Sequence, residues 1–432
     1  MPTGPGSDEQ DRSLSWWSPY SWFSWRPPMM VDLLAAESRM LSRVWHLIDN
    51  KFVSISNGSK QIRTITLNTK SAKMPLILVH GMGSGVGLWS LNLHSLSLHR
   101  PVYAFDLLGF GGSSRPEFSS DPMLAEMEFV ESIEEWRQEM KLDKFILLGH
   151  SLGGFLAMSY AIRYPTRIAH LVLCDPWGFP ERPLDAERRT PLPAWVKMVS
   201  KVLQVFNPLA ALRAAGPWGA KVVSFFRTDL IRKFDDFDDD TVAQYVFQCN
   251  ARKPSGEVAF RNMTVPIGWA KHPMIRRVND LPLDIPISML YGSRSWIDSS
   301  VGWQVKFQRN DAYVDIQVVK GAGHHIYADK AEEFNTSVNK ICRGVDQEQE
   351  QGFSAFTLPK RRRTHSDSSL PTFDPRPDLT SVSPGGRRGR YVHRQTSIQE
   401  DNEERSSEGD NKRQEDSEPE DLDKDIDTVF FE

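Results

Sequence analysis

A serine set between glycines is the residue whose surroundings most clearly indicate chemistry in this sequence. Residues 149–153 read Gly-His-Ser-Leu-Gly and match the pattern G-x-S-x-G. The apolar run Phe145 to Leu148 precedes the motif, and residues 154–158 continue as a helix-forming stretch. In this context the motif places the serine on a sharp turn between a strand and a helix, where larger neighbours would clash. We therefore predict that Ser151 is a nucleophile; the alternative is that its hydroxyl caps the helix.

A nucleophilic serine needs a base, and two adjacent histidines follow the last apolar run of the folded part. The run Tyr313 to Val319 leads into Lys320-Gly-Ala-Gly and then His324 and His325. We favour His324 as the base because it comes first after the glycines. The histidines that flank the earlier glycine motifs, His80 and His150, are expected to make local structural hydrogen bonds instead.

The base needs a carboxylate that orients it, and two aspartates follow predicted strands. Asp298 lies beyond the run Ile287 to Tyr291, and Asp175 lies directly after Leu171 to Leu173. The chain order serine, acid, histidine and the loop position favour Asp298, with Asp175 as the alternative. Asp106 also follows a strand, and as a nucleophile it would allow dehalogenase-type chemistry. The motif for the sharp strand-to-helix turn is at Ser151, however, which argues against Asp106.

The negative charge that develops on an attacked carbonyl must be stabilised by backbone N–H groups. We expect one such group at Leu152, directly after the nucleophile, and the other at Met82, in the glycine-rich loop 80–85 that follows an earlier strand. A phosphate-binding loop is the alternative for residues 80–85. The Lys-Ser/Thr ending and the G-x-G-x-x-G spacing are both absent, which disfavours nucleotide binding.

The elements that must position these residues are short strands alternating with helical patterns. Two runs around Asn57-Gly58 indicate an opening hairpin, and residues 126–140 have helical spacing. Such alternation predicts an α/β fold, with a mostly parallel central sheet flanked by helices. The runs interpreted as strands are 52–55, 62–67, 76–79, 102–105, 145–148, 171–173, 287–291 and 313–319.

The composition divides the chain into unequal parts. We expect a Trp-rich anchor segment over residues 1–45, a core over 46–178 and 282–345, a helical cap over 179–281 with helices at 194–206 and 217–234, and a disordered charged tail over 346–432. The tail is poor in large aliphatic residues and its basic and acidic residues are segregated, so it cannot bury enough apolar surface to fold.

Charge and cysteine content exclude several classes of protein. The 52 basic and 56 acidic residues leave a net charge of −4, which argues against a globally basic nucleic-acid binder. Three widely spaced cysteines argue against a disulfide framework or a structural zinc site and suggest a reducing compartment. No apolar run approaches the ~20 residues that a spanning helix needs. We expect a soluble or peripheral intracellular protein that needs no metal or organic cofactor.

Aromatic residues near the start of the chain suggest where the protein works. The segment is short and interrupted by prolines, and its amphipathic rings are of the kind that settle at the headgroup level of a membrane or lipid droplet. Packing of the same rings on the body is the alternative. The tryptophans are Trp16, Trp17, Trp22 and Trp25.

Several motifs together resemble one subfamily of α/β-hydrolase-domain proteins. It holds the N-acyl-phosphatidylethanolamine lysophospholipase and the lipid-droplet co-activator of triglyceride lipase. The resemblance covers about residues 12–346. Because the co-activator branch carries Asn at the nucleophile position, Ser151 places this sequence closer to the lysophospholipase branch. Gly112 stands where the subfamily usually has Arg, and the tail has no counterpart there. The matching stretches are 105–111, 149–154, 175–180, 207–209, 254–257 and 323–329.

The resemblance implies a serine hydrolase with an inserted helical cap that cleaves acyl esters of (lyso)phospholipids, including N-acyl phosphatidylethanolamine-type lipids. It implies a cytoplasmic protein, peripheral on lipid droplets or the endoplasmic reticulum membrane, with a lipid-droplet coat protein or a lipase as further partners. Two alternatives are a lipase co-activator or scaffold, and a lysophosphatidic acid acyltransferase. His324 and Asp329 fit the acyltransferase signature proposed for the subfamily; we favour His324 as the triad base and Asp329 as a cap of the following helix.

Overall fold

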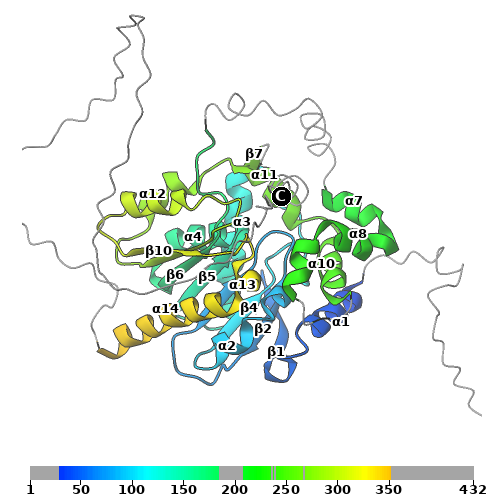
Figure 1. Cartoon of the computed structure of the whole chain (residues 1–432), viewed down its shortest axis with the longest axis horizontal. Coiled ribbons are helices and arrows are strands. Elements are labelled where there is room, and N and C mark those ends of the chain that lie inside the picture. Colours follow the sequence, from blue (N-terminus) through cyan, green and yellow to red (C-terminus); the bar gives the residue numbers. More distant parts are fainter. Residues whose placement is uncertain (1–28, 184–207, 235–236, 238–239, 266–267, 352–432) are drawn as a thin grey trace, which may run out of the picture. The chain divides into compact units, whose positions relative to one another are not determined.

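A central eight-stranded sheet with helices on both faces forms the folded body (Figure 1). The computed structural model describes residues 29–183, 208–234, 237, 240–265 and 268–351. The strands are β1 (Asp49–Ile55), β2 (Lys60–Leu67), β3 (Leu76–Val79), β4 (Val102–Phe105), β5 (Phe145–His150), β6 (Ile168–Cys174), β7 (Thr264–Val265), β8 (Trp269–Ala270), β9 (Ile287–Gly292) and β10 (Val314–Val319). The helices are α1 (Met30–Met40), α2 (Leu93–Ser97), α3 (Pro122–Glu139), α4 (Leu152–Arg163), α7 (Pro208–Ala214), α8 (Gly219–Phe226), α9 (Thr228–Ile231), α10 (Thr241–Ala251), α11 (Gly256–Met263), α12 (Ser300–Gln308), α13 (Ile326–Asp329) and α14 (Ala331–Gln351).

The strand order β1-β2-β4-β3-β5-β6-β9-β10 confirms the mostly parallel sheet. Within this sheet of the described residues, β2 runs opposite to the other strands: its pairings with β1 and β4 are antiparallel, and the remaining pairings are parallel. The expected hairpin is present, and its turn needs the left-handed conformation at Ser56, Asn57 and Gly58, with φ of 51°, 54° and 84°. Because β3, β5, β6, β9 and β10 run parallel, the loops that follow them meet at one edge of the sheet.

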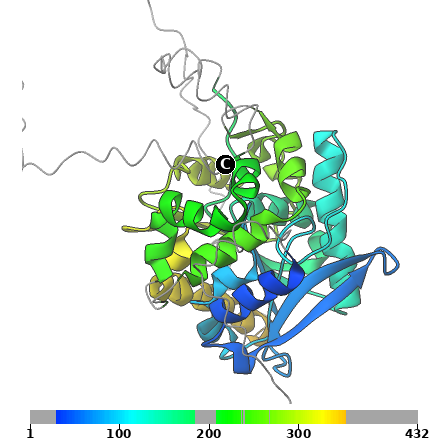
Figure 2. The same cartoon turned by 90° about the vertical axis from the view of Figure 1, so that its right-hand side faces the viewer.

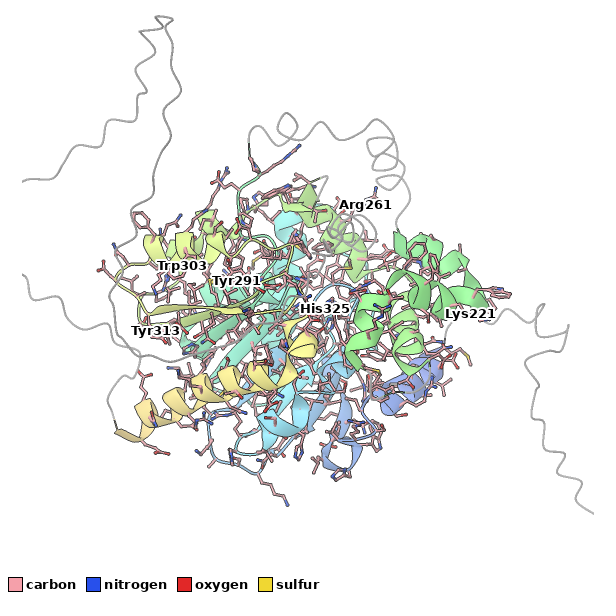
Figure 3. The ribbon with its side chains drawn as sticks, in the orientation of Figure 1. Lys221, Arg261, Tyr291, Trp303, Tyr313 and His325 are labelled. Atoms are coloured by element: carbon pink, nitrogen blue, oxygen red, sulfur yellow. The ribbon has the colours of Figure 1, made fainter. Side chains whose placement is uncertain are left out.

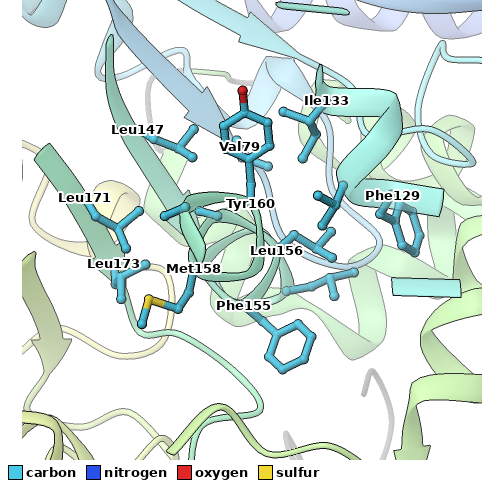
Figure 4. Packing of buried hydrophobic residues seen from close by; sticks show 14 of the residues in the cluster. Val79, Phe129, Ile133, Leu147, Phe155, Leu156, Met158, Tyr160, Leu171 and Leu173 are labelled. Atoms are coloured by element: carbon cyan, nitrogen blue, oxygen red, sulfur yellow. The ribbon is translucent and has the colours of Figure 1, made fainter. Parts of the chain in front are cut away.

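Alternate residues of each central strand enter two hydrophobic layers. On β5, Phe145 and Leu147 pack with α3 and α4, whereas Ile146 and Leu148 pack with α1, α2 and α14 on the other face. Figure 4 shows the first layer, in which Leu156 of α4 lies among strand side chains and α3. Continuous apolar runs are expected for strands covered on both faces.

The helices that cover the sheet begin and pack as their sequences indicate. The carboxylate of Asp121 accepts the backbone N–H groups of Met123 and Leu124, 2.9 Å away in each case, and caps α3, whose first residue is proline. The predicted helical spacing over 126–140 is confirmed by α3. In α14 a stripe of buried side chains at helical spacing packs on the opposite layer: Phe334, Val338, Ile341 and Val345.

The helices α7 to α11, together with the 3-10 turn η6 (Arg232–Phe234), lie in the chain between β6 and β9; we call them the cap helices. They contact the loops at the carboxyl edge: the Asn250 amide donates to the Gly83 carbonyl at 2.7 Å, and the Gly87 N–H donates to the Tyr245 hydroxyl at 2.8 Å. The helix expected over 217–234 is not continuous, because α8 ends before Arg227, whose φ of −121° and ψ of 43° are not helical. The helix expected at 194–206 lies outside the described residues.

The first described helix belongs to the body. We expected residues 1–45 to form an anchor segment, but α1 buries Leu33, Ala36 and Met40 against the core. It packs beside α10, which in turn contacts α8, so α1 lies next to the cap helices (Figure 2). The tail boundary expected at residue 346 is also wrong, because α14 continues to Gln351 and its Asp346 is buried and pairs with Arg100 at 2.8 Å. Residues 1–28, which hold the Trp-rich cluster, and residues 352–432 of the charged tail lie outside the described residues.

Candidate active site

Ser151 occupies a strained turn between β5 and α4. Its backbone has φ 52° and ψ −120°, a conformation that side chains other than glycine rarely adopt. The turn needs the flanking glycines: a Cβ on Gly149 would lie 2.2 Å from the Gly153 carbonyl oxygen, and a Cβ on Gly153 would lie 2.4 Å from that of Val79. The Ser151 side chain makes no capping hydrogen bond to α4, so helix capping does not explain its position.

Two backbone N–H groups flank this serine. Leu152 is the first residue of α4, and Met82 lies in the loop after β3. That loop packs directly on the turn, because a Cβ on Gly81 would lie 3.0 Å from the Ser151 Cβ. Neither the Leu152 nor the Met82 amide donates to a backbone carbonyl in the part of the chain that the structure describes. The oxyanion role of these two N–H groups stays a prediction.

His324 is paired with Asp175 and not with Asp298. Its Nδ1 lies 3.1 Å from Oδ2 of Asp175, whose other oxygen accepts the Gly292 N–H at 3.1 Å. Asp298, which we favoured as the acid, accepts the Ser300 N–H at 2.8 Å and lies at the start of α12. The structure therefore gives the orienting position to the alternative acid.

Strand order explains this correction. Asp175 directly follows β6, which pairs with β5, and the Ser151 N–H donates to the Cys174 carbonyl at 3.0 Å. Cys174, which accepts this hydrogen bond, directly precedes Asp175, so the backbone of Asp175 lies close to that of Ser151. Asp298 is several residues beyond β9, at a helix start where a carboxylate is stabilised by the free N–H groups.

The loop that carries His324, residues 321–329, is held on both sides of the histidine; we call it the histidine loop. Asp329 accepts the Gly323 N–H at 2.9 Å, and His150 donates from Nε2 to the His324 carbonyl at 3.0 Å. Asp329 therefore closes the histidine loop and does not cap α14 as we expected. His325 is partly buried; it faces Tyr327 and His150 and lies between α13 and the cap helices (Figure 3).

The Ser151 hydroxyl and the His324 imidazole, both within the described residues, are not hydrogen-bonded to each other. Such a bond often tightens only when substrate binds. The two residues are nevertheless neighbours, since the ring of His150, next to Ser151 in the chain, lies 4.7 Å from the ring of His324 between centroids.

Burial sets the protonation of this group. It lowers the pKa of His324 well below the usual 6.5, and the positive charges of Lys233 and Arg227 lower it further. Burial raises the pKa of Asp175, while hydrogen bonds from Ser295 and Gly292 favour its ionised form. A neutral imidazole is the form that accepts a proton from a serine.

The other candidates have structural roles. His80 donates from Nδ1 to the Gly81 carbonyl at 2.7 Å and accepts the Leu107 N–H at Nε2, 2.9 Å away, so its expected structural hydrogen bonding is confirmed. His150 is also structural, but its bond reaches the distant histidine loop. Asp106 is fully buried, and its two oxygens accept the N–H groups of Val86 and Gly112, which leaves it no nucleophilic role.

Two residues of the cap helices escaped the sequence analysis. Lys233 and Arg227 lie close enough to His324 to affect its pKa, yet no motif marks either residue. The Trp296 ring also lies 5.1 Å from that of His324, between centroids. No three His, Cys, Asp or Glu side chains of the described residues gather as a metal-binding group.

Comparison with known proteins identifies the family. The sequence profile of the alpha/beta hydrolase fold matches residues 74–331. This chain belongs to the α/β hydrolase family. Human (lyso)-N-acylphosphatidylethanolamine lipase is 52% identical over 320 residues, which cover 73% of this chain and 93% of that protein. The rat protein named 1-acylglycerol-3-phosphate O-acyltransferase ABHD5 is 51% identical over 315 residues, covering 73% and 90%.

Solved structures agree on the fold of this α/β hydrolase. Naproxen esterase from Bacillus subtilis superposes with a TM-score of 0.52 at 18% identity, covering 72% of this chain and 97% of the esterase. A bacterial membrane phospholipase A superposes with a TM-score of 0.50 at 19% identity, covering 73% and 91%. No helix among the described residues is both long and apolar enough to cross a membrane.

Proposed function

We propose that this α/β hydrolase is a serine hydrolase that cleaves acyl esters of (lyso)phospholipids, including N-acyl phosphatidylethanolamine-type lipids. The observation that carries the proposal is the strained turn at Ser151, near a partly buried histidine that is paired with an aspartate. The substrate class is supported by the high identity to a protein named as a (lyso)-N-acylphosphatidylethanolamine lipase, which extends over most of that protein.

In the proposed mechanism the Nδ1 of His324 donates to Asp175, which leaves Nε2 free to take the proton of the Ser151 hydroxyl. The serine oxygen attacks the ester carbonyl, and the N–H groups of Leu152 and Met82 stabilise the oxyanion. His324 then protonates the leaving glycerol oxygen. Water, activated by the same imidazole, hydrolyses the acyl-serine and releases the fatty acid.

Release of fatty acid from defined lipids tests this proposal. Purified full-length protein is incubated with a lysophospholipid and with an N-acyl phosphatidylethanolamine in mixed micelles. Wild-type protein should release fatty acid, whereas Ser151→Ala, checked for folding by circular dichroism, should fall to the level without enzyme. Equal release by the two proteins would refute the role of Ser151.

A transferase activity is the second candidate, because a relative of equal identity is named as a 1-acylglycerol-3-phosphate O-acyltransferase. An acyl-serine passes its acyl group to a lipid alcohol as readily in principle as to water, so no second site is needed. Labelled acyl donor with added lysophosphatidic acid should then give labelled phosphatidic acid, and Ser151→Ala should give none.

A scaffold role is the remaining alternative. It predicts that Ser151→Ala leaves lipolysis in cells unchanged.

Membrane association is proposed for the Trp-rich segment, which lies outside the described residues. Indole rings favour the interface between lipid and water, and the segment precedes α1 in the chain. Full-length protein should float with phospholipid vesicles, and a variant with Trp16, Trp17, Trp22 and Trp25 replaced by Ala should not. Equal flotation of the wild-type protein and the four-tryptophan variant would contradict the proposed anchor role of these residues.

A further inference from the structure

An ion pair joins the cap helices to the histidine loop. Lys233 Nζ, in η6, lies 3.2 Å from Oδ1 of Asp329, at the end of α13. The two side chains are only 15% and 11% exposed. The other oxygen of Asp329 accepts the N–H of Gly323, directly before His324. One carboxylate therefore binds the cap with one oxygen and the backbone of the histidine loop with the other.

Lys233 is itself held in place from the cap side. Asp229, one helical turn earlier, lies 3.7 Å from Lys233 Nζ and also pairs with Arg227 at 3.0 Å. This group has two positive side chains, Lys233 and Arg227, and two negative ones, Asp229 and Asp329, so its formal charges cancel. It is therefore suited to joining two elements and not to binding a free anion. Both side chains of the pair are mostly shielded from water, so removing one partner leaves a poorly solvated charge, which is locally destabilising.

We propose that Lys233 is a positioning residue, whose ion pair with Asp329 couples the position of the cap helices to the placement of His324 beside Asp175. The inference rests on the proposed serine hydrolase function. It also gives Asp329 a role in loop geometry, without a separate acyltransferase site. The glycines at 321 and 323 give the histidine loop freedom, and the link to the cap restrains it.

The pH dependence of kcat/KM separates this role from a general loss of packing, because the two partners of the ion pair shift the pKa of His324 in opposite directions. Lys233 lowers the pKa of His324, whereas Asp329 raises it. Lys233→Met should therefore move the acidic limb of kcat/KM to higher pH, and Asp329→Asn should move it to lower pH. The groups that face His324 in this comparison are Asp175, Lys233, Arg227, Asp329, His150 and His325.

The experiment compares Lys233→Met, Lys233→Arg, Asp329→Asn and the double variant with Lys221→Met as control. Lys221 is an exposed cap lysine that lies over the Trp218 ring, away from the histidine loop. We expect Lys233→Met to lower kcat about 10- to 100-fold with little change in KM, since small displacements of catalytic groups have such effects. Lys233→Arg should recover most of the loss, and the double variant should lose no more than the worse single variant.

Two results would overturn the proposal: Lys233→Met with the kcat of Lys221→Met, or acidic limbs that move in the same direction in Lys233→Met and Asp329→Asn. A wild-type protein without esterase activity would instead contradict the proposed function.

The coupling through the ion pair is also tested by hydrogen exchange. Lys233→Met should speed exchange in the peptide spanning 321–329 relative to Lys221→Met, and unchanged exchange would reject the coupling.

Discussion

At the scale of single residues, the base of this site is defined by what surrounds it. His324 is held through its ring by Asp175 and through its backbone carbonyl by His150, so both its tautomer and its orientation are set. Its burial beside Lys233 disfavours the imidazolium. The residue types were visible in the sequence, but the partner of the histidine was not, because Asp175 and Asp298 both follow strands of the same sheet.

The choice of acid is tested by a matched pair of substitutions. Asp175→Asn should lower kcat about 10,000-fold, because the amide no longer holds the tautomer that leaves Nε2 free. Asp298→Asn should keep near wild-type activity, since this carboxylate bonds only to the start of α12 among the contacts described. Steady-state rates on a soluble ester measure both. A larger loss in Asp298→Asn would restore the acid that the chain order favoured.

The protonation of His324 predicts the pH dependence of the wild-type enzyme. Burial lowers the pKa, so the neutral, competent base persists as the pH falls below 6.5. The acidic limb of kcat/KM should therefore lie below pH 6.5. A limb above that value, measured where circular dichroism shows intact folding, would contradict the buried environment of the imidazole.

At the scale of elements, the turn between β5 and α4 depends on glycine packing. A Cβ on Gly153 would meet two backbone carbonyls within 2.5 Å, whereas a Cβ on Gly154 finds its nearest contacts at 3.0 Å. Gly153→Ala should thus lose about 1–3 kcal/mol of unfolding free energy and Gly154→Ala less. Urea unfolding gives the comparison, and equal losses would mean that the turn relaxes freely.

The elements themselves follow closely from the sequence. The runs read as strands correspond to β1 to β6, β9 and β10. The central strands β3, β4, β5 and β9 are buried along their whole length and have nearly continuous apolar sequences. The strands β1 and β2 are less apolar and are marked by the turn between them. The break of the expected helix at Arg227 was missed, since neither glycine nor proline marks it in the sequence. Lys233 and Asp329 meet through the packing of η6 on α13, for which local sequence holds no signal.

At the scale of the whole molecule, α1 ties the body together. Its Glu37 pairs with Arg63 of β2, both almost fully buried, while its other side packs on α10 of the cap helices. The helix thus joins the sheet to the cap directly after the Trp-rich segment.

Breaking that pair should be costly. Arg63→Met should lower the unfolding free energy by about 3–5 kcal/mol, because Glu37 is left buried without its partner. Arg167→Met, which removes an exposed pair with Asp143, should change it by less than about 1 kcal/mol. Urea unfolding measures both variants. A small effect of Arg63→Met would show that the Glu37–Arg63 pair contributes little to holding α1 on the sheet.

The reactivity of a single hydroxyl tests the central claim most directly. A fluorophosphonate probe is added to purified wild-type protein, and the labelled peptide is identified by mass spectrometry. We predict one covalent adduct, on Ser151, that forms in the native protein and does not form when the protein is denatured before the probe is added. Labelling of folded Ser151→Ala at the wild-type rate, or no labelling of folded wild-type protein, would contradict it.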